Sequence, residues 1–121
     1  MEALRNVYGQ WAEGRFRAGA ELLAPDVEFW ADPERTVYHG PEGVARYMAG
    51  FLKSFEDFRI SAEDVQVRGD RVLVLQRQTG RSQETGMDLD AGTACIWTFR
   101  GDQAIKIEQI FRRDEALAVF S

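Results

Sequence analysis

One acidic residue stands out because of its neighbours. A strand-like apolar run that begins at Val27 ends on Asp32, two residues after Trp30 and immediately before Pro33. A carboxylate at the mouth of an apolar pocket would be desolvated, and its pKa would rise toward the range that suits proton transfer. Asp before Pro is also ordinary turn chemistry. The residues alone leave both interpretations open.

Three other side chains could take part in chemistry. Tyr8 could donate a hydrogen bond to a bound carbonyl or enolate, although a core tyrosine would occupy the same helix stripe. His39, the only histidine, precedes Gly40-Pro41, where capping or packing explains it better than base catalysis. Cys95 lies inside an apolar strand without a neighbouring histidine, so we do not expect a nucleophile. One Cys and one His predict no internal disulfide, no metal site and no cofactor.

Composition narrows the class of protein. The 121 residues suit one domain over residues 1–121. The 15 basic residues are scattered and are outnumbered by 20 acidic ones, so we expect neither nucleic-acid nor membrane binding. The first residues do not form a signal peptide, and the chain has no apolar run of spanning length. These features predict a cytoplasmic location.

Two amphipathic helices are expected in the first half of the chain. The first has an apolar stripe at helical spacing, formed by Leu4, Val7, Tyr8 and Trp11. It would end near Gly14, and a short helix over residues 17–23 would follow, because Pro25 disfavours helical geometry at the residue before it. The other long helix would begin at Gly40-Pro41. Its stripe is formed by Val44, Tyr47, Met48, Phe51, Leu52 and Phe55.

Strand-like segments dominate the rest. We expect strands over residues 26–32, 58–68, 71–83, 87–100 and 103–113, joined by hairpin turns, and a closing helix from Asp114. Helices followed by an antiparallel meander predict an α+β fold, in which a highly curved, mostly antiparallel sheet wraps around the N-terminal helices and encloses one central pocket. Both faces of the later strands are partly apolar, so alternation does not identify the pocket face. The second apolar face suggests a homodimer through the convex side.

The order of elements resembles a known family. After a helix that carries a tyrosine, the segments ELLAPDVEFWADP, YHGPEGVARYM and IKIEQIFRRDEALA resemble the SnoaL-like branch of the nuclear-transport-factor-2-like, ketosteroid-isomerase-like superfamily over nearly the whole chain. The resemblance implies an α+β cone. Ketosteroid isomerases carry a catalytic Tyr in the first helix and a catalytic Asp before a Pro, and Tyr8 and Asp32 match both. The position matched to that family's second, protonated Asp is Cys95, whose thiol is a weak donor.

The same registration implies which side chains face the cavity. Besides the catalytic candidates Tyr8 and Asp32, they are Trp30, Leu73, Leu75, Arg77, Cys95, Trp97, Glu108, Ile110 and Arg112. An apolar set with a few ionisable groups is typical of a small-molecule site. Arg77 between Asp32 and Glu108 would resemble, in chemical type, the carboxylate–arginine–carboxylate arrangement of limonene-epoxide hydrolases. An internal ion pair between Arg77 and Glu108 would explain the presence of Arg77 equally well. We expect Arg112 and Arg113 to lie at a solvated strand end.

Two functions remain. One is an enzyme of isomerase, cyclase or hydrolase type that performs acid–base chemistry on an apolar carbonyl- or epoxide-bearing compound. Asp32 would move the proton, Tyr8 would stabilise the oxyanion, and Arg77 with Glu108 would position substrate or water. The alternative is a non-catalytic ligand-binding or dimerisation module of the same fold, suggested by Cys95. A pocket carboxylate that titrates near neutrality would favour the enzyme.

Overall fold

The computed structural model describes residues 2–121 as helices packed on a six-stranded sheet. In chain order the elements are α1 (Glu2–Ala12), the 3₁₀ turn η1 (Ala20–Leu22), β1 (Leu23–Ala31), β2 (Thr36–His39), α2 (Gly40–Ser54), β3 (Phe55–Arg68), β4 (Arg71–Ser82), β5 (Asp88–Arg100), β6 (Gln103–Ile110) and α3 (Arg113–Phe120). None of these helices is long and apolar enough to cross a membrane.

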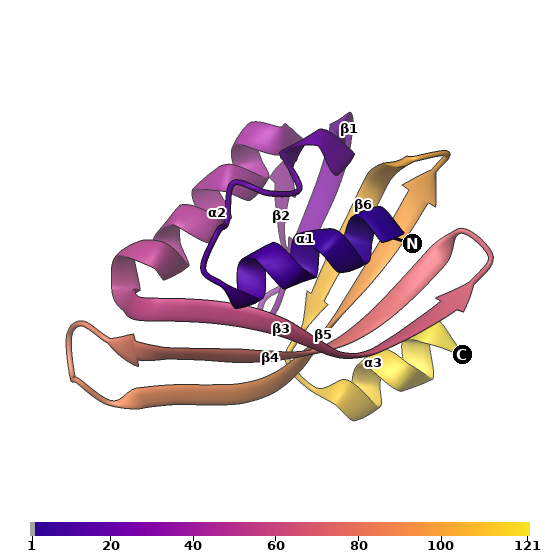
Figure 1. The fold of residues 1–121 in the computed structure, drawn as a ribbon. Coiled ribbons are helices and arrows are strands. Elements are labelled where there is room, and N and C mark those ends of the chain that lie inside the picture. The colour runs from indigo at the N-terminus through magenta and orange to yellow at the C-terminus, as the bar shows by residue number, and fades with distance from the viewer. Residues whose placement is uncertain (1) are drawn as a thin grey trace.

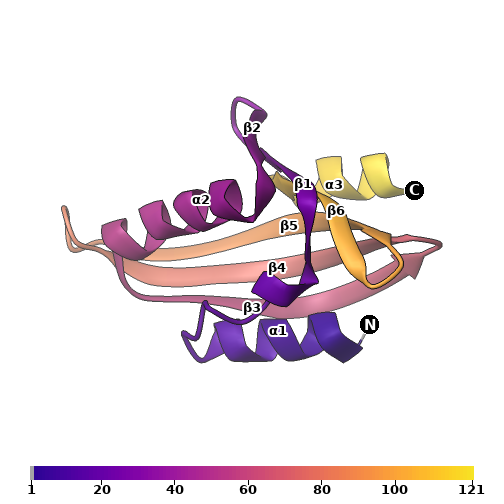
Figure 2. The same cartoon turned by 90° about the horizontal axis from the view of Figure 1, so that it is seen from above.

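The sheet has the order β2-β1-β6-β5-β4-β3. Neighbouring strands are antiparallel except β1 and β6, which are parallel. Helices α1 and α2 lie on one side of the sheet and α3 lies on the other (Figure 1). Helix α1 runs along β3, whereas α2 packs against β1, so the two helices cover different parts of the same face (Figure 2). The α+β class with a mostly antiparallel, curved sheet is confirmed.

Irregularities in the longest strand help to curve the sheet. The pairing of β3 with β4 shifts register between Glu56 and Arg59 and again between Ala62 and Asp64. Such bulges bend a strand and increase its twist. The turns before β4 and β6 use Gly69 and Gly101, which adopt left-handed φ angles of 63° and 66° that glycine tolerates.

The elements differ from the sequence-based expectations in several places. Strands β1 and β3 each begin three residues earlier than expected, at Leu23 and Phe55. The helix expected over residues 17–23 is reduced to η1, because Gly19 has φ 102° and turns the chain tightly against Val7 of α1. Strand β2 was not expected, since four residues are too few to show an alternating pattern. The last strand ends at Ile110 instead of residue 113, and Arg113 already belongs to α3.

Each face of the sheet has its own core. The larger core lies between the concave face and helices α1 and α2, and it includes Leu4, Val7, Phe58 and Ile60. The smaller core lies beneath α3 and consists of Leu73, Ala94, Ile96, Ile110, Ala116 and Phe120, with Leu75 packed against it. Helix α3 of the same chain therefore covers part of the second apolar face.

Candidate ligand-binding cavity

A cavity of about 450 Å³ lies between the sheet and the helices α1 and α2. Its wall is largely apolar, and its aromatic members are Tyr8, Trp11, Phe16, Phe29, Tyr47, Phe51, Phe58 and Trp97. Val44, Tyr47 and Met48 of α2 are only half-buried, because these side chains line the cavity as well as packing against the larger core. The volume falls within the range of sites that bind small organic molecules.

Strand register determines which sheet residues reach the cavity. Gln76 lies opposite Thr93, and Cys95 lies opposite Gln109. Directly opposite residues in antiparallel strands point to the same face, so these four side chains share the concave side. Gln76, Gln78, Cys95, Trp97, Ile107 and Gln109 line the cavity from β4, β5 and β6.

The polar atoms of the cavity form one buried network. The indole nitrogen of Trp97 donates to the Tyr8 hydroxyl at 3.0 Å, and that hydroxyl donates to Gln76 Oε1 at 2.8 Å. Gln76 Nε2 donates to Gln109 Oε1 at 2.9 Å and to Thr93 Oγ1 at 3.2 Å. The Tyr8 hydroxyl therefore already donates its one proton to Gln76.

The ionisable groups deep in the cavity are held neutral. Burial raises the pKa of the Tyr8 hydroxyl well above its ordinary value of 10.0. Burial likewise raises the pKa of the Cys95 thiol and of the Tyr47 hydroxyl. A thiol and two phenols that keep their protons at neutral pH are uncharged hydrogen-bonding groups rather than bases or nucleophiles.

Asp32 lies beyond the ends of β1 and β6 and does not line the cavity. Its Oδ2 accepts a hydrogen bond from the Phe111 amide at 2.9 Å, and its own amide donates to the Gln109 carbonyl at 3.2 Å. The charge of Asp32 contributes to the raised pKa of Tyr47, after burial and the effects of Cys95 and Tyr38. Asp32 thus acts electrostatically on a cavity residue from outside the cavity wall.

The structure divides the other expected cavity residues between the two faces. Cys95 and Trp97 lie in the cavity wall, as does Tyr8. Leu73, Leu75 and Ile110 lie on the opposite face, beneath α3. The sequence analysis therefore assigned the wrong face of β4 and β6 to the cavity. Both faces of these strands carry apolar residues, and the alternation pattern does not show that one of the faces packs against α3.

Trp30, Glu108 and Arg112 also lie away from the cavity. The Trp30 ring is flanked by the guanidinium of Arg35, 5.4 Å from the ring centroid, and by the Lys106 ammonium at 5.1 Å. Glu108 pairs with Arg35 at 3.4 Å. Arg112 is exposed and pairs with Asp114 at 2.9 Å, so it is solvated as expected. The expectation of a solvated strand end is wrong for Arg113, which is half-buried at the start of α3.

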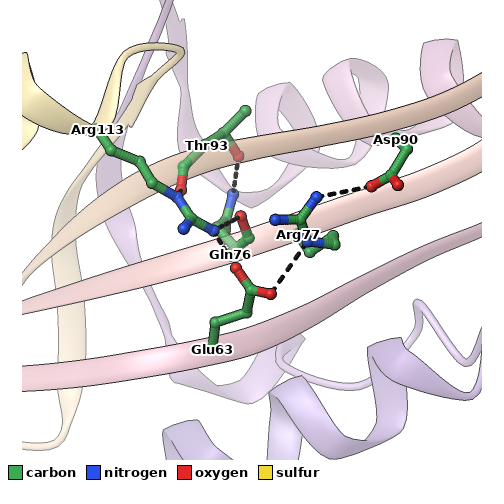
Figure 3. Close-up of polar contacts among 6 residues, drawn as sticks. All are labelled: Glu63, Gln76, Arg77, Asp90, Thr93 and Arg113. Carbon is green, nitrogen blue, oxygen red and sulfur yellow. Dashed lines mark hydrogen bonds and ion pairs between the residues drawn. The ribbon is translucent and has the colours of Figure 1, made fainter.

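Arg77 joins a charged cluster on the convex face instead of the predicted pair with Glu108. Its guanidinium bonds to Glu63 at 3.0 Å and to Asp90 at 2.8 Å (Figure 3). Arg113 reaches over β5 into the same cluster and pairs with Glu63. It also donates to the backbone carbonyls of Gln76 at 2.7 Å and of Thr93 at 3.2 Å. Arg113 therefore fixes, from the convex side, two residues whose side chains belong to the cavity network.

Sequence reasoning missed the glutamines of the cavity. Gln76, Gln78 and Gln109 are buried, although glutamine is mostly exposed in proteins. A signal was available, because Gln76 and Gln78 continue the alternation of Val72 and Val74 along β4. His39 occupies the position before α2 as expected, but its side chain makes no capping hydrogen bond.

The charged residues do not form a metal-binding cluster within the part of the chain that the structure describes. No group of three or more His, Cys, Asp or Glu side chains in residues 2–121 is arranged to hold a metal ion. Apart from the exposed Arg17, the side chains of the cavity wall are instead apolar groups and neutral hydrogen-bonding groups, which suits an organic ligand.

Comparisons with known proteins agree with this geometry. Residues 4–107 match the family described as SnoaL-like domain, whereas no curated protein matches the chain. Similar solved structures include an NTF2-like protein of unknown function from Burkholderia pseudomallei, with TM-score 0.80, 19% identity and coverage of 100% of this chain and 96% of that one. TerC, co-crystallised with polyporic acid, has TM-score 0.78, 22% identity and coverage of 97% and 94%. A SnoaL-like protein from Jannaschia sp. CCS1, suggested by its name to be a polyketide cyclase, has TM-score 0.79, 21% identity and coverage of 98% and 87%.

Proposed function

Because this chain belongs to the SnoaL-like domain family, we propose that it binds a mainly apolar, ring-containing small molecule with a carbonyl or epoxide oxygen. The ligand would occupy the cavity between α1, α2 and the concave face of the sheet. The observation that carries the proposal is the combination of an aromatic wall around about 450 Å³ with one buried polar network. Apolar walls with a few convergent polar groups are the usual form of such sites. Support also comes from TerC, which has this fold and was crystallised with polyporic acid.

Ligand screening with a blocked variant tests the proposal. We expect ring ketones, lactones or epoxides to raise the melting temperature of the wild-type protein. Val44→Trp places a large ring in the cavity from α2 and should abolish the shift. Arg46→Trp is the matched control, since Arg46 is exposed on the same helix and does not line the cavity. Equal shifts in wild-type and Val44→Trp protein would show that the ligands bind elsewhere.

Acid–base turnover of the bound compound is the second candidate function. It rests on the match of Tyr8 and Asp32 to the catalytic pair of ketosteroid isomerases, with Tyr8 in the cavity wall and Asp32 beyond the ends of β1 and β6. In this proposal Asp32 moves the proton, and Tyr8 stabilises the oxyanion once a ligand replaces Gln76 as the acceptor of its proton. Asp32→Asn keeps an oxygen that can accept the Phe111 bond, so it should retain ligand affinity and lose turnover. Turnover at the wild-type rate in this variant would remove Asp32 from the mechanism.

The homodimer and the cytoplasmic location stay predictions of the sequence. Exposed Phe111, Leu117 and Val119 at or beside α3 support an association through the convex side, with exposed fractions of 42%, 39% and 49%. Sedimentation velocity of the wild type and of Leu117→Asp tests it. A monomer at micromolar wild-type concentration would contradict the dimer.

A further inference from the structure

Gln78 is a buried amide of the cavity wall, 7% exposed, and it lines the cavity from β4. Its side chain shares the concave face with Ile60, its pairing partner on β3, which also lines the cavity. Among the described residues 2–121, no side chain or backbone group forms a hydrogen bond with the Gln78 amide. Buried polar groups are nearly always paired, because desolvating them without a new partner is costly. The Gln78 amide therefore points to a partner that enters the cavity.

Both polar atoms of this amide remain accessible. Gln109 Nε2 also lacks a partner in the part of the chain that the structure describes, but it has less than 1 Å² of accessible surface. That nitrogen is closed off from the cavity. Oε1 and Nε2 of Gln78 are not closed off in this way. Since Gln78 points to the concave face, the surface that these two atoms keep belongs to the cavity, where a ligand can reach it.

The hydrogen-bond network beside Gln78 does not supply the missing partner. Two residues earlier on the same face of β4, Gln76 already donates both hydrogens of its Nε2 and accepts the proton of Tyr8. Two residues later, Gly80 has no side chain, and a Cβ there would lie 3.3 Å from the Phe55 Cβ. The concave face of β4 therefore offers the Gln78 amide neither a donor nor an acceptor.

The surroundings favour an uncharged ligand group. Phe58 stacks on Phe16 and on Phe51, with ring centroids 5.6 Å and 5.3 Å apart, and all three rings line the cavity. The charged residue of the lining, Arg17, is exposed, so water screens its charge. A charged group bound beside the phenylalanine rings would lose its hydration without gaining a close counter-charge, which is unfavourable.

A glutamine amide is fully paired only by a group with two functions. Its Nε2 donates and its Oε1 accepts, so the partner must present an acceptor and a donor side by side. A ketone or lactone oxygen pairs with Nε2, displaces water from the cavity and leaves Oε1 without a donor, which costs affinity. The C=O and N–H groups of a cyclic amide are adjacent and point the same way, so they can bond to both atoms of the Gln78 amide.

We infer that Gln78 pairs with a cyclic-amide edge of the ligand, with Nε2 donating to the ligand carbonyl and Oε1 accepting the ligand N–H. This pairing makes the cavity selective for cyclic amides over lactones of the same shape. The inference rests on the proposed function, since it places the ligand in the same cavity, and it narrows the class of carbonyl compound. It assigns Gln78 as a specificity-determining residue and leaves the roles of Asp32 and Tyr8 unchanged.

Two probes of one shape test the inference by calorimetry. 2-Quinolone is a cyclic amide, and coumarin is the lactone in which a ring oxygen replaces the N–H. We expect the wild type to bind 2-quinolone about tenfold more tightly than coumarin, the effect of one well-formed hydrogen bond. Val44→Trp, which places a large ring in the cavity, should abolish the binding of both probes.

Two variants assign the preference to the amide. Gln78→Met keeps an unbranched side chain without the amide, so 2-quinolone should bind it no more tightly than coumarin does. Met48→Leu is the matched control, because it changes an apolar side chain of the same cavity wall and leaves the Gln78 amide in place. It should keep the affinity ratio of the wild type. The ratio within each variant cancels changes in cavity shape that affect both probes equally.

A spectroscopic measurement makes the test independent of how well the variants fold. In wild-type protein labelled with ¹⁵N, the side-chain amide protons of Gln78 should resonate further downfield with bound 2-quinolone than with bound naphthalene, which has the same two-ring shape and no polar atom.

Three results would overturn the inference while cavity binding stands: equal wild-type affinities for 2-quinolone and coumarin, a retained preference in Gln78→Met, or the same Gln78 signal with 2-quinolone as with naphthalene. If neither 2-quinolone nor coumarin binds the wild type, or if both bind Val44→Trp equally well, the proposed function fails and the inference fails with it.

Discussion

Removal of the Arg113 guanidinium should destabilise the protein more than its position near the surface suggests. Arg113 donates to two backbone carbonyls, those of Gln76 and Thr93, and packs over Gly92, where a Cβ would lie 3.1 Å from the guanidinium carbon. The Thr93 carbonyl lies just past the last β5–β6 pair, Ala94 with Ile110, where no β6 residue remains to pair with it. Arg113 thus replaces a missing strand neighbour.

The size of the effect follows from these two bonds. A hydrogen bond from a charged donor contributes about 1.5–3 kcal/mol when buried. The Arg113 side chain is 29% exposed, so water can partly solvate the two carbonyl groups that lose their donor. We therefore expect Arg113→Met to lower the free energy of unfolding by about 2–3 kcal/mol. Urea unfolding followed by circular dichroism measures this as a lower midpoint at an unchanged slope.

Two controls separate the carbonyl bonds from the ion pair. Glu63→Gln removes the charge partner and keeps both carbonyl bonds, so its unfolding midpoint should lie close to that of the wild type. Arg113→Lys keeps the charge without the planar fork and should fall between the wild type and Arg113→Met. The reasoning is refuted if Arg113→Met unfolds at the wild-type midpoint, or if Glu63→Gln is equally destabilised.

Three further outcomes can be checked by unfolding experiments. Tyr8→Phe leaves buried Gln76 Oε1 and Trp97 Nε1 without partners and should cost about 1–3 kcal/mol; a wild-type urea midpoint would contradict the network. Gly50→Ala in α2 adds a Cβ with nothing within 4 Å and should stabilise by about 0.5–1 kcal/mol, so a lower melting temperature would speak against an ordinary helix there. Burial raises the folded-state pKa of Cys95 and Tyr8 above the ordinary values of 9.0 and 10.0, so the folded protein holds these protons longer than the unfolded chain does. Their contribution to stability is complete below those values and is lost as pH rises above them; a constant urea midpoint from pH 8 to 11 would be inconsistent with this.

The sequence contained most of the information about element type and order. The stripe from Leu4 to Trp11 and the longer stripe after Gly40-Pro41 specify two helices, because apolar residues at helical spacing need a surface to cover. Gly69 and Gly101 mark two of the hairpins. The resemblance to the SnoaL-like branch, which depends on this order, is confirmed by the family match.

The candidate site was harder to predict because its residues come from strands with two apolar faces. Along β4, Val72 and Leu73 are both fully buried, the first under the N-terminal helices and the second under α3. Both residues are apolar, so hydrophobicity does not show which of them faces the cavity. Only the position of α3 shows that Leu73 lies on the opposite face. The partners of the charged residues were equally hard to predict. Arg77 had possible acidic partners on either face of the sheet, and in the structure it pairs with Glu63 and Asp90.

The sequence by itself thus determined the helices, the hairpins and their order, since these depend on spacing between near neighbours in the chain. Only the tertiary structure decided that Gln76 and Gln109 face the cavity, and that Asp32 lies outside its wall. The physical reason is that strand register and helix docking depend on contacts between residues far apart in sequence. Tyr8 and Gln76, 68 positions apart, bond only once those long-range contacts have formed.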